Sequence, residues 1–348
     1  MKATIYDVAK KAGVSIATVS KVINNTGNMR ESTRQRVIEI MKEMNYRPNM
    51  AASALTGKGT KTLGLLIPDI SNPFFSEMAR TIEDRAHELG MSVIICSTDE
   101  NDEKEKKYVE LLRDKNVDGF IVGASFKDKR VLQSLIKDHI PLVLLTHDDV
   151  SLDITRVSID DFKGGYEATS HLLAQGHRNI AIIAEHAYSS NIRITGYKEA
   201  HNIYGDTCKE ENILRTFASI ENGRSCFNQL FNRTNPSPPT AIFACNDQLA
   251  IGVIQGAKEK GIDVPVDLSV IGFDNTILAT TTVPGLTTIS QPISEMGERT
   301  VDLLVEEIKR GESLKERVVF TPELIIRGTT SKVNKNNKWK QNIYLENG

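Results

Sequence analysis

Residues 5–24 constrain the fold more than any other stretch, because they predict two short helices joined by a tight turn. Thr4 can cap the first helix, and Asp7 places a carboxylate in its first turn, where the backbone amides favour negative charge. Gly13 has no Cβ and suits the sharp reversal that ends this helix. Ser15 can then cap the second helix. This arrangement predicts a helix-turn-helix, which places its second helix in the major groove of DNA.

The second helix, expected over residues 16–23, divides into a buried and an exposed face. Val19, Val22 and Ile23 fall on the buried side. The same pattern also fits an ordinary corner between two helices of a globular domain. If the stretch reads DNA, the candidate contacts in and around it are Thr4, Ser15, Ile16, Ala17, Thr18, Ser20, Lys21 and Asn24.

Positive charge gathers near the amino end, as expected of a nucleic-acid-binding module. Residues 1–58 contain ten Lys and Arg against four Asp and Glu, whereas the whole chain has a formal net charge of −2. A third helix is expected over residues 32–44, with Val37 and Ile40 on its apolar stripe. Four arginines flank it and can meet phosphates, or can simply form a solvated face: Arg30, Arg34, Arg36 and Arg47.

Pro48 breaks this pattern, and residues 50–57 follow as one or two turns of small, helix-permissive residues. A helix so short is not stable alone, so we expect it to order only against its twin from a second subunit. Small residues such as Ala52 would allow that close approach, and Leu55 would project outward as a wedge.

Four motifs in residues 4–57 carry a family resemblance: A-x-x-x-G-V-S at 9–15, T-V-S-K-V-I-N at 18–24, T-R at 33–34 and N-Y-R-P-N at 45–49. The stretch closely resembles the headpiece of the LacI/GalR transcriptional regulators. The resemblance implies a homodimer on a near-palindromic operator, with paired hinge helices in the minor groove and Leu55 opening a central base step. Lys21 stands where the family commonly has arginine, so the resemblance does not indicate which DNA sequence this chain binds.

From residue 61 onward, near-continuous apolar strands alternate with amphipathic helices, as in parallel sheets covered on both faces. A first set has strands at 62–67, 92–96, 119–122 and 142–145 and helices at 77–89, 104–114 and 129–138. A second set has strands at 156–159, 180–183, 241–244 and 268–271 and helices at 163–174, 192–202, 223–231 and 248–260. The expected fold is therefore α/β: a three-helix headpiece and hinge helix, then a two-lobed, doubly wound, periplasmic-binding-protein-like core.

The family resemblance implies that the chain crosses between the lobes near Asp160, Gln291 and Thr321. The domains expected on this basis are a headpiece at 1–48, a hinge and linker at 49–60, a core at 61–330 and a basic, disordered tail at 331–348. Within the core, the first lobe takes about 61–159 and 292–320, and the second about 160–291 and 321–330.

Polar and aromatic residues collect where these strands end, and ligands of open parallel sheets bind beyond the carboxyl ends of the strands. A carboxylate or guanidinium there can each bind two hydroxyls, and a flat ring can cover an apolar ligand face, which suits a sugar or sugar phosphate effector. The candidates are Asp69, Asn72, Phe74, Phe75, Arg193, Phe217, Asn246, Asp247, Asp274 and Gln291.

Simpler roles exist for several of these candidates. Phe74 and Phe75 fit a core position at a helix start, and Asn246 and Asp247 fit a helix cap. In the family that the chain resembles, the positions matching Arg193 and Asp274 commonly touch the effector.

Other classes of site and location find little support. The apolar runs are shorter than the roughly 18 residues that span a bilayer, and the first residues lack a signal peptide core, so we expect a cytoplasmic protein without a membrane partner. The four cysteines are far apart and predict reduced thiols. The run His147-Asp148-Asp149 reads as a solvated loop rather than a metal site. Because the nucleophile, phosphate-loop and metalloprotease motifs are missing, we expect no catalytic residues and no cofactor.

The resulting hypothesis is a homodimeric, effector-responsive regulator, in the first instance a repressor of carbohydrate-use genes. Activation of transcription, or operator binding enhanced by the ligand, fits the same sequence. A sugar receptor of the periplasmic type is the alternative from another class, but the basic headpiece opposes it. An enzyme with a DNA-binding appendage would need a nucleophile, metal or phosphate loop.

Overall fold

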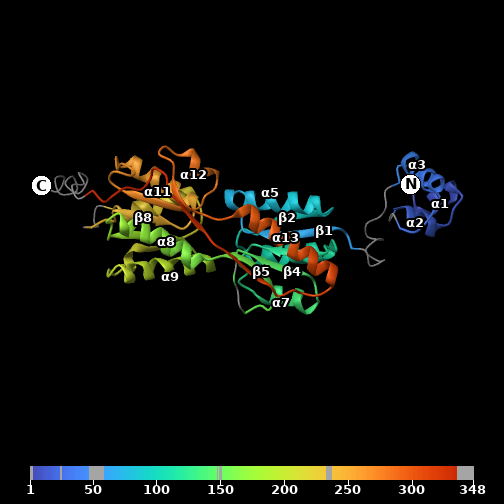
Figure 1. Cartoon of the computed structure of the whole chain (residues 1–348), viewed down its shortest axis with the longest axis horizontal. Helices are drawn as coiled ribbons and strands as arrows, with labels where there is room; N and C mark the ends of the chain where they lie inside the picture. Colours follow the sequence, from blue (N-terminus) through green and yellow to red (C-terminus); the bar gives the residue numbers. More distant parts are fainter. Residues whose placement is uncertain are drawn as a thin grey trace. The chain divides into compact units, whose positions relative to one another are not determined.

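The computed structural model describes residues 3–23, 26–46, 59–146, 148, 151–232 and 237–334. The chain divides into two compact units, Met1–Thr60 and Lys61–Gly348 (Figure 1). Several predicted features lie outside the described residues, namely Asn24, Arg47, Ala52, Leu55, the hinge helix at 50–57 and residues 335–348 of the tail.

Three helices form the first unit: α1 (Ile5–Ala12), α2 (Ile16–Ile23) and α3 (Glu31–Glu43). The Thr4 hydroxyl accepts a hydrogen bond from the Asp7 amide, and the Asp7 carboxylate accepts one from the Thr4 amide, which completes a capping box. Gly13 ends α1 in the left-handed conformation, with a φ of 66°. The helices close over a small core of Val8, Ala9, Ala12, Val19, Val22 and Val37.

The second unit begins with a six-stranded sheet in the order β11-β5-β4-β3-β1-β2, in which every neighbouring pair is parallel. Its strands are β1 (Thr62–Ile67), β2 (Ser92–Ser97), β3 (Gly119–Val122), β4 (Leu142–Leu145), β5 (Thr155–Ile159) and β11 (Arg317–Phe320). Its helices are α5 (Pro73–Glu88), α6 (Asp102–Asp114), α7 (Arg130–Lys137) and α13 (Ile293–Arg310). Helices α5 and α13 pack together on one face of the sheet, and α7 lies on the other (Figure 1).

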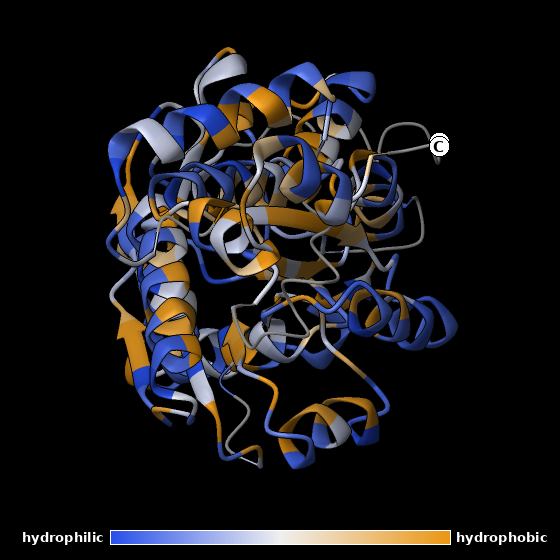
Figure 2. Cartoon of the chain, turned by 90° about the vertical axis from the view of Figure 1, so that its right-hand side faces the viewer, coloured by the Kyte–Doolittle hydropathy of each residue, from blue (hydrophilic) through white to orange (hydrophobic). Residues whose placement is uncertain are grey.

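A second six-stranded sheet has the order β12-β10-β9-β8-β6-β7, and only its edge strand β12 runs antiparallel. Its strands are β6 (Ile180–Glu185), β7 (Ile213–Thr216), β8 (Ala241–Ala244), β9 (Ser269–Asp274), β10 (Thr287–Ser290) and β12 (Glu323–Ile325). Its helices are α8 (Asp161–Ala174), α9 (Tyr188–Ile203), α10 (Ile220–Leu230), α11 (Asp247–Glu259) and the short α12 (Ile277–Thr281), with a 3-10 turn η1 (Glu210–Asn212). Strands in Figure 2 are mostly apolar while the helices carry mixed faces, as expected of sheets covered on both sides.

The chain passes between the two sheets three times: after β5, after β10 and between β11 and β12. The strand expected at 156–159 was listed with the second set of strands, which is wrong, whereas the predicted bounds of the first lobe, 61–159, include it correctly. Strand β5 pairs with β4 and β11 in the first sheet. The first crossing follows it at Asp160, whose amide donates a hydrogen bond to the Phe320 carbonyl at 2.9 Å.

The disordered tail was predicted to begin at residue 331, and the described residues 331–334 contradict that start. The Ser331 amide donates to Ser269 Oγ at 3.0 Å, and the Val333 amide donates to the Gln175 carbonyl at 3.0 Å. Residues 331–334 therefore bind along the second lobe, and the prediction of disorder is wrong for them because their backbone groups find partners there.

Two glycines let α8 and α9 approach closely. A Cβ on Gly165 would lie 2.2 Å from the backbone oxygen of Arg193, and a Cβ on Gly196 would lie 2.2 Å from the backbone oxygen of Phe162. Both distances are far shorter than van der Waals contact, so any larger residue would push the two helices apart. The contact at Gly165 fixes where Arg193 stands beside α8.

We expect Gly196→Ala to destabilise the second unit by about 2 kcal/mol, because its methyl group would collide with backbone rather than with an adjustable side chain. Thermal unfolding of the full chain measures the loss. Thr195→Ala, at the exposed neighbouring position, is the matched control and should change the melting temperature little. Equal behaviour of the two variants would contradict this account of the helix contact.

Candidate functional site

The first candidate surface is the outer face of α2. Ile16, Ala17 and Lys21 are exposed, with 40% of Ile16 accessible, while Thr18 and Ser20 are half-buried. Ser15 caps the helix, since its hydroxyl accepts a hydrogen bond from the Thr18 amide at 3.2 Å. The face therefore offers a lysine, two hydroxyls and small apolar groups, a set that can enter a groove without steric conflict.

Two other predicted DNA contacts have local partners in the structure. The Thr4 hydroxyl donates to the Asp7 carboxylate at 2.6 Å and, with the backbone contact of Thr4, lowers the pKa of that carboxyl. Arg34 lies 3.9 Å from Glu31 on α3, and a quarter of its side chain is accessible. Thr4 thus acts as a helix cap in the free protein, and Arg34 stays within reach of solvent.

The second candidate site is a cavity of about 400 Å³ between the two lobes of the second unit, named here the interlobe cavity. Residues at or just beyond the carboxyl ends of both parallel sheets form its walls, as the topology dictates. Of the predicted effector contacts, the structure brings together Asp69, Asn72, Phe74, Phe75, Arg193, Phe217, Asp274 and Gln291.

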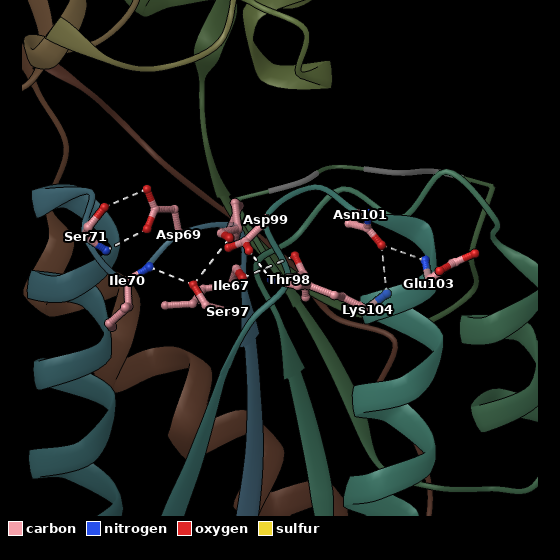
Figure 3. Close-up of polar contacts among 11 residues, drawn as sticks. Ile67, Asp69, Ile70, Ser71, Ser97, Thr98, Asp99, Asn101, Glu103 and Lys104 are labelled. Atoms are coloured by element: carbon pink, nitrogen blue, oxygen red, sulfur yellow. Dashed lines mark hydrogen bonds and ion pairs between the residues drawn. The ribbon is translucent and has the colours of Figure 1, made fainter. Parts of the chain in front are cut away.

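The first lobe contributes a wall of loops after β1 and β2 (Figure 3). The Asp69 carboxylate accepts hydrogen bonds from the amide and the hydroxyl of Ser71, at 2.8 and 2.7 Å. Asp99 forms an ion pair with Lys104. Asp99 and Glu100 both have positive φ, 53° and 52°, a conformation that costs free energy for residues with a Cβ.

The second lobe contributes a buried polar group centred on Arg193. Its Nε donates to Asp161 at 2.7 Å, and its Nη1 donates to the Cys245 carbonyl at 2.6 Å. The guanidinium also lies over the Phe273 ring, 3.6 Å from its centroid. Burial opposes the charge, but the neighbouring Asp161 carboxylate outweighs it, so the pKa of Arg193 is raised and the cation persists.

Asp274 lies at the end of β9 with a positive φ of 106°. It accepts a hydrogen bond from Gln291 Nε2 at 2.6 Å, and Gln291 follows β10 at the second crossing. Burial raises the pKa of the Asp274 carboxyl well above its ordinary value, although Arg193 opposes the shift. The crossing segment is thereby tied to a residue of the cavity wall.

Aromatic rings face the cavity from both lobes. Phe74 and Phe75 meet edge to face at 5.0 Å, and Phe74 is only 5% accessible, so it serves the core as well as the wall. Phe217 is 58% accessible and contacts the His186 ring at 5.4 Å. Asn72 caps α5 by accepting from the Phe74 amide at 3.1 Å.

Asn246 and Asp247 are not among the residues that line the interlobe cavity, so their role as effector contacts stays a prediction. Asn246 caps α11, accepting from the Leu249 amide at 2.8 Å, and donates to Glu185. Asp247 accepts from the hydroxyls of Thr276 and Thr288, at 2.9 and 2.7 Å. These hydrogen bonds within the second lobe occupy polar atoms of both side chains.

Comparison with known proteins yields two family matches. Residues 4–49 match "Bacterial regulatory proteins, lacI family", and residues 169–330 match a "Periplasmic binding protein-like domain". The chain is also 46% identical over 339 residues to the HTH-type transcriptional regulator DegA of Bacillus subtilis (strain 168), covering 96% of this chain and 100% of DegA. The chain belongs to the lacI family. It is accordingly a DNA-binding transcriptional regulator.

Two solved structures of similar proteins agree with this assignment. A lac repressor dimer bound to operator and the anti-inducer ONPF is 29% identical, with a TM-score of 0.84 over 95% of this chain and 100% of that one. A complex of the transcriptional regulator CelR with cellobiose is 26% identical, with a TM-score of 0.72 over 94% and 99%. The predicted family and the two-lobed α/β fold of this LacI-family regulator are confirmed.

Several charged residues of the cavity wall in this LacI-family protein were missed by sequence reasoning: Asp99, Glu100, Lys127, Asp161, Glu185 and His186. The rule that ligands bind beyond strand ends could have found most of them, because they end or follow β2, β3, β5 and β6. Among the described residues, no group of His, Cys, Asp and Glu could hold a metal ion. No described helix is long and apolar enough to cross a bilayer.

His171 and His177 have structural partners in this regulator. His171 Nε2 lies 2.9 Å from the Thr330 hydroxyl, and His177 Nδ1 lies 2.9 Å from the Thr240 hydroxyl. Burial lowers the pKa of both imidazoles. They hold the last described segment onto the second lobe.

Asp161→Asn is expected to destabilise this LacI-family regulator by about 3 kcal/mol, because it leaves the buried Arg193 cation without a carboxylate. Thermal unfolding measures the loss. Glu167→Gln is the matched control on the same helix, since its pair with Lys163 spans 3.7 Å at the surface and contributes little. A loss no larger than that of the control would show that the Arg193 charge is compensated elsewhere.

A second prediction concerns pH. Glu105 on α6 is 1% accessible, and burial together with the Asp102 charge raises its pKa from 4.5 to about 7. Such a carboxyl stabilises the fold below its unfolded pKa, and this contribution is lost as pH rises through about 7. Glu105→Gln should therefore stabilise the protein more at pH 8 than at pH 5, by about 2 kcal/mol. Glu110→Gln, at an exposed position on the same helix, is the control. A stability gain in Glu105→Gln that does not depend on pH, or that Glu110→Gln matches, would contradict the raised pKa of Glu105.

Proposed function

We propose that this chain is a homodimeric, effector-responsive repressor that binds a near-palindromic operator with two headpieces. The observation that carries the proposal is the interlobe cavity, a ligand-sized space walled by hydrogen-bonding groups and rings in a chain that also has a helix-turn-helix unit. The similar lac repressor is a dimer on its operator, which supports the same assembly here.

The ligand class that fits this cavity best is a sugar or sugar derivative that controls carbohydrate-use genes. Arg193 gives only two of its five N–H donors to Asp161 and Cys245, so donors remain for ligand hydroxyls. Gln291 and Asn72 add amide groups, and Phe75 and Phe217 offer flat faces for an apolar side of a ring. The similar regulator CelR was solved with cellobiose, which supports this class.

A ligand in the cavity would act by shifting the position of one lobe relative to the other. It contacts both lobes, so it binds most tightly to one lobe arrangement and raises the population of that arrangement. A coupling of about 1–3 kcal/mol would change operator affinity roughly 5- to 150-fold. Footprinting of genomic fragments with full-length protein, with and without the hits of a thermal-shift sugar screen, tests both halves of the proposal.

Leu55→Ala tests the paired hinge that the family resemblance assigns to residues 50–57. A leucine that wedges a central base step contributes to specific complexes only, so the variant should lose at least tenfold in operator affinity and little on random DNA. Gel shifts at fixed salt measure both. Equal losses on the two DNAs would refute the wedge, and Lys21→Ala, which removes one groove-facing cation, provides the comparison.

A further inference from the structure

The charge of the interlobe cavity restricts the ligand beyond the proposed sugar class. Among the described residues that line it, six are carboxylates, whereas Lys127 and Arg193 are the permanent cations. A cavity of about 400 Å³ is large enough to hold a small ligand, and a ligand inside it lies beside these charges. The affinity of a ligand for the interlobe cavity therefore depends on its net charge.

Three of the six carboxylates are already compensated by the protein. Asp161 is paired with Arg193 and Asp99 with Lys104. Asp274 is buried, and burial favours its neutral form. These groups contribute little net negative charge to a ligand.

The remaining three carboxylates are Asp69, Glu100 and Glu185. Lys127 and His186 oppose the charge of Glu100, and Glu185 also acts on the Arg193 cation, which is already paired with Asp161. Lys127 also lies 3.9 Å from Asp102 on α6, so its charge is shared outside the cavity. Asp69 accepts hydrogen bonds from Ser71 in its own loop, and these neutral donors leave its charge in place. The uncompensated charge is therefore carried by Asp69 and the two glutamates, Glu100 and Glu185.

These two glutamates approach the cavity from opposite lobes. Glu100 follows β2 in the first lobe, and Glu185 ends β6 in the second. Glu185 is held in place by hydrogen bonds from Ser190 and Asn246, which are neutral donors and leave its charge intact. Partial burial in the cavity and then the Glu185 charge raise the pKa of Glu100, while Lys127 and His186 oppose the shift, so the two glutamates repel each other.

We infer that the effector carries a protonated amine, which binds between Glu100 and Glu185 and joins the two lobes. A hydroxylated amine such as an amino sugar satisfies both the charge and the hydrogen-bonding walls. A phosphate or carboxylate would instead add negative charge beside two glutamates, so of the sugar and sugar phosphate expected from the sequence, the phosphate is disfavoured. This inference rests on the proposed function, because it names the ligand of the same cavity.

Isothermal titration at pH 7.5 with matched sugar series tests the inference. Each series contains one hexose as the neutral sugar, the 2-amino sugar, the N-acetylated amino sugar and the 6-phosphate, for glucose, galactose and mannose. The amino member of at least one series should bind at least tenfold more tightly than its neutral and N-acetylated counterparts, with the phosphate weakest.

Glu100→Gln is the decisive variant, because Glu100 is exposed, lines the cavity and makes no hydrogen bond or ion pair with the described residues. It should lose at least tenfold in affinity for the amino sugar and stay within about twofold for the neutral one. Glu103→Gln removes the same charge three residues away, outside the cavity wall, and should behave as wild type. Circular dichroism and operator affinity confirm that both variants are folded.

Preference for a neutral or phosphorylated sugar overturns the inference, as does equal loss of amino and neutral sugars in Glu100→Gln or the failure of every amino sugar to bind. If the protein prefers a neutral or phosphorylated sugar, or if Glu100→Gln weakens binding of both sugars equally, the proposed function still holds provided that a sugar alters operator binding. A wild-type protein that binds no genomic operator refutes the proposed function, whatever the titrations show.

Discussion

The structure of the second lobe depends on burying one positive charge. Arg193 is 6% accessible, and its cation is tolerated because Asp161, the Cys245 carbonyl and the Phe273 ring surround it. This arrangement requires α9 to approach α8 closely, which a glycine at 165 permits. The same packing places Asp161, the first residue after a crossing between the lobes, beside the cavity. The contact between α8 and α9, the ion pair of Arg193 with Asp161 and the wall of the interlobe cavity therefore depend on one another.

This dependence also changes how Arg193 can be studied. Its truncation to alanine would remove three interior interactions together with any ligand contact, so loss of ligand response would not isolate binding. Phe217 and Glu100 are better probes of the cavity, because both are exposed and neither supports the core. Buried residues that line the cavity, such as Arg193, stabilise the fold as well as facing a ligand, whereas exposed ones can contact a ligand without supporting the core.

Sequence reasoning found the elements with a strong local signal but missed four strands, β7, β10, β11 and β12, and the long helix α13. Apolar runs revealed β1 and β6, and Gly13 with Ser15 revealed the turn between α1 and α2, because these signals are local. Strands β7, β11 and β12 are short or half-buried edge strands, and their pairing depends on distant partners that no local pattern shows. Asn246 and Asp247 had the right chemistry for a ligand, but Thr276, Thr288 and the α11 amides already occupied them. Tertiary contacts decide whether a polar side chain bonds to a neighbouring residue or stays available to a ligand.

The response to a ligand must come from what differs between lobe arrangements. Besides the three crossing segments, Glu77 on α5 links the lobes by accepting a hydrogen bond from the Ile277 amide at 3.1 Å. This bond is exposed and therefore weak, so it can be exchanged without large cost when the lobes move. The repulsion between Glu100 and Glu185 opposes their approach, whereas a ligand that neutralises both favours it. A small set of charged groups from both lobes thus gives a ligand the differential affinity that a population shift requires.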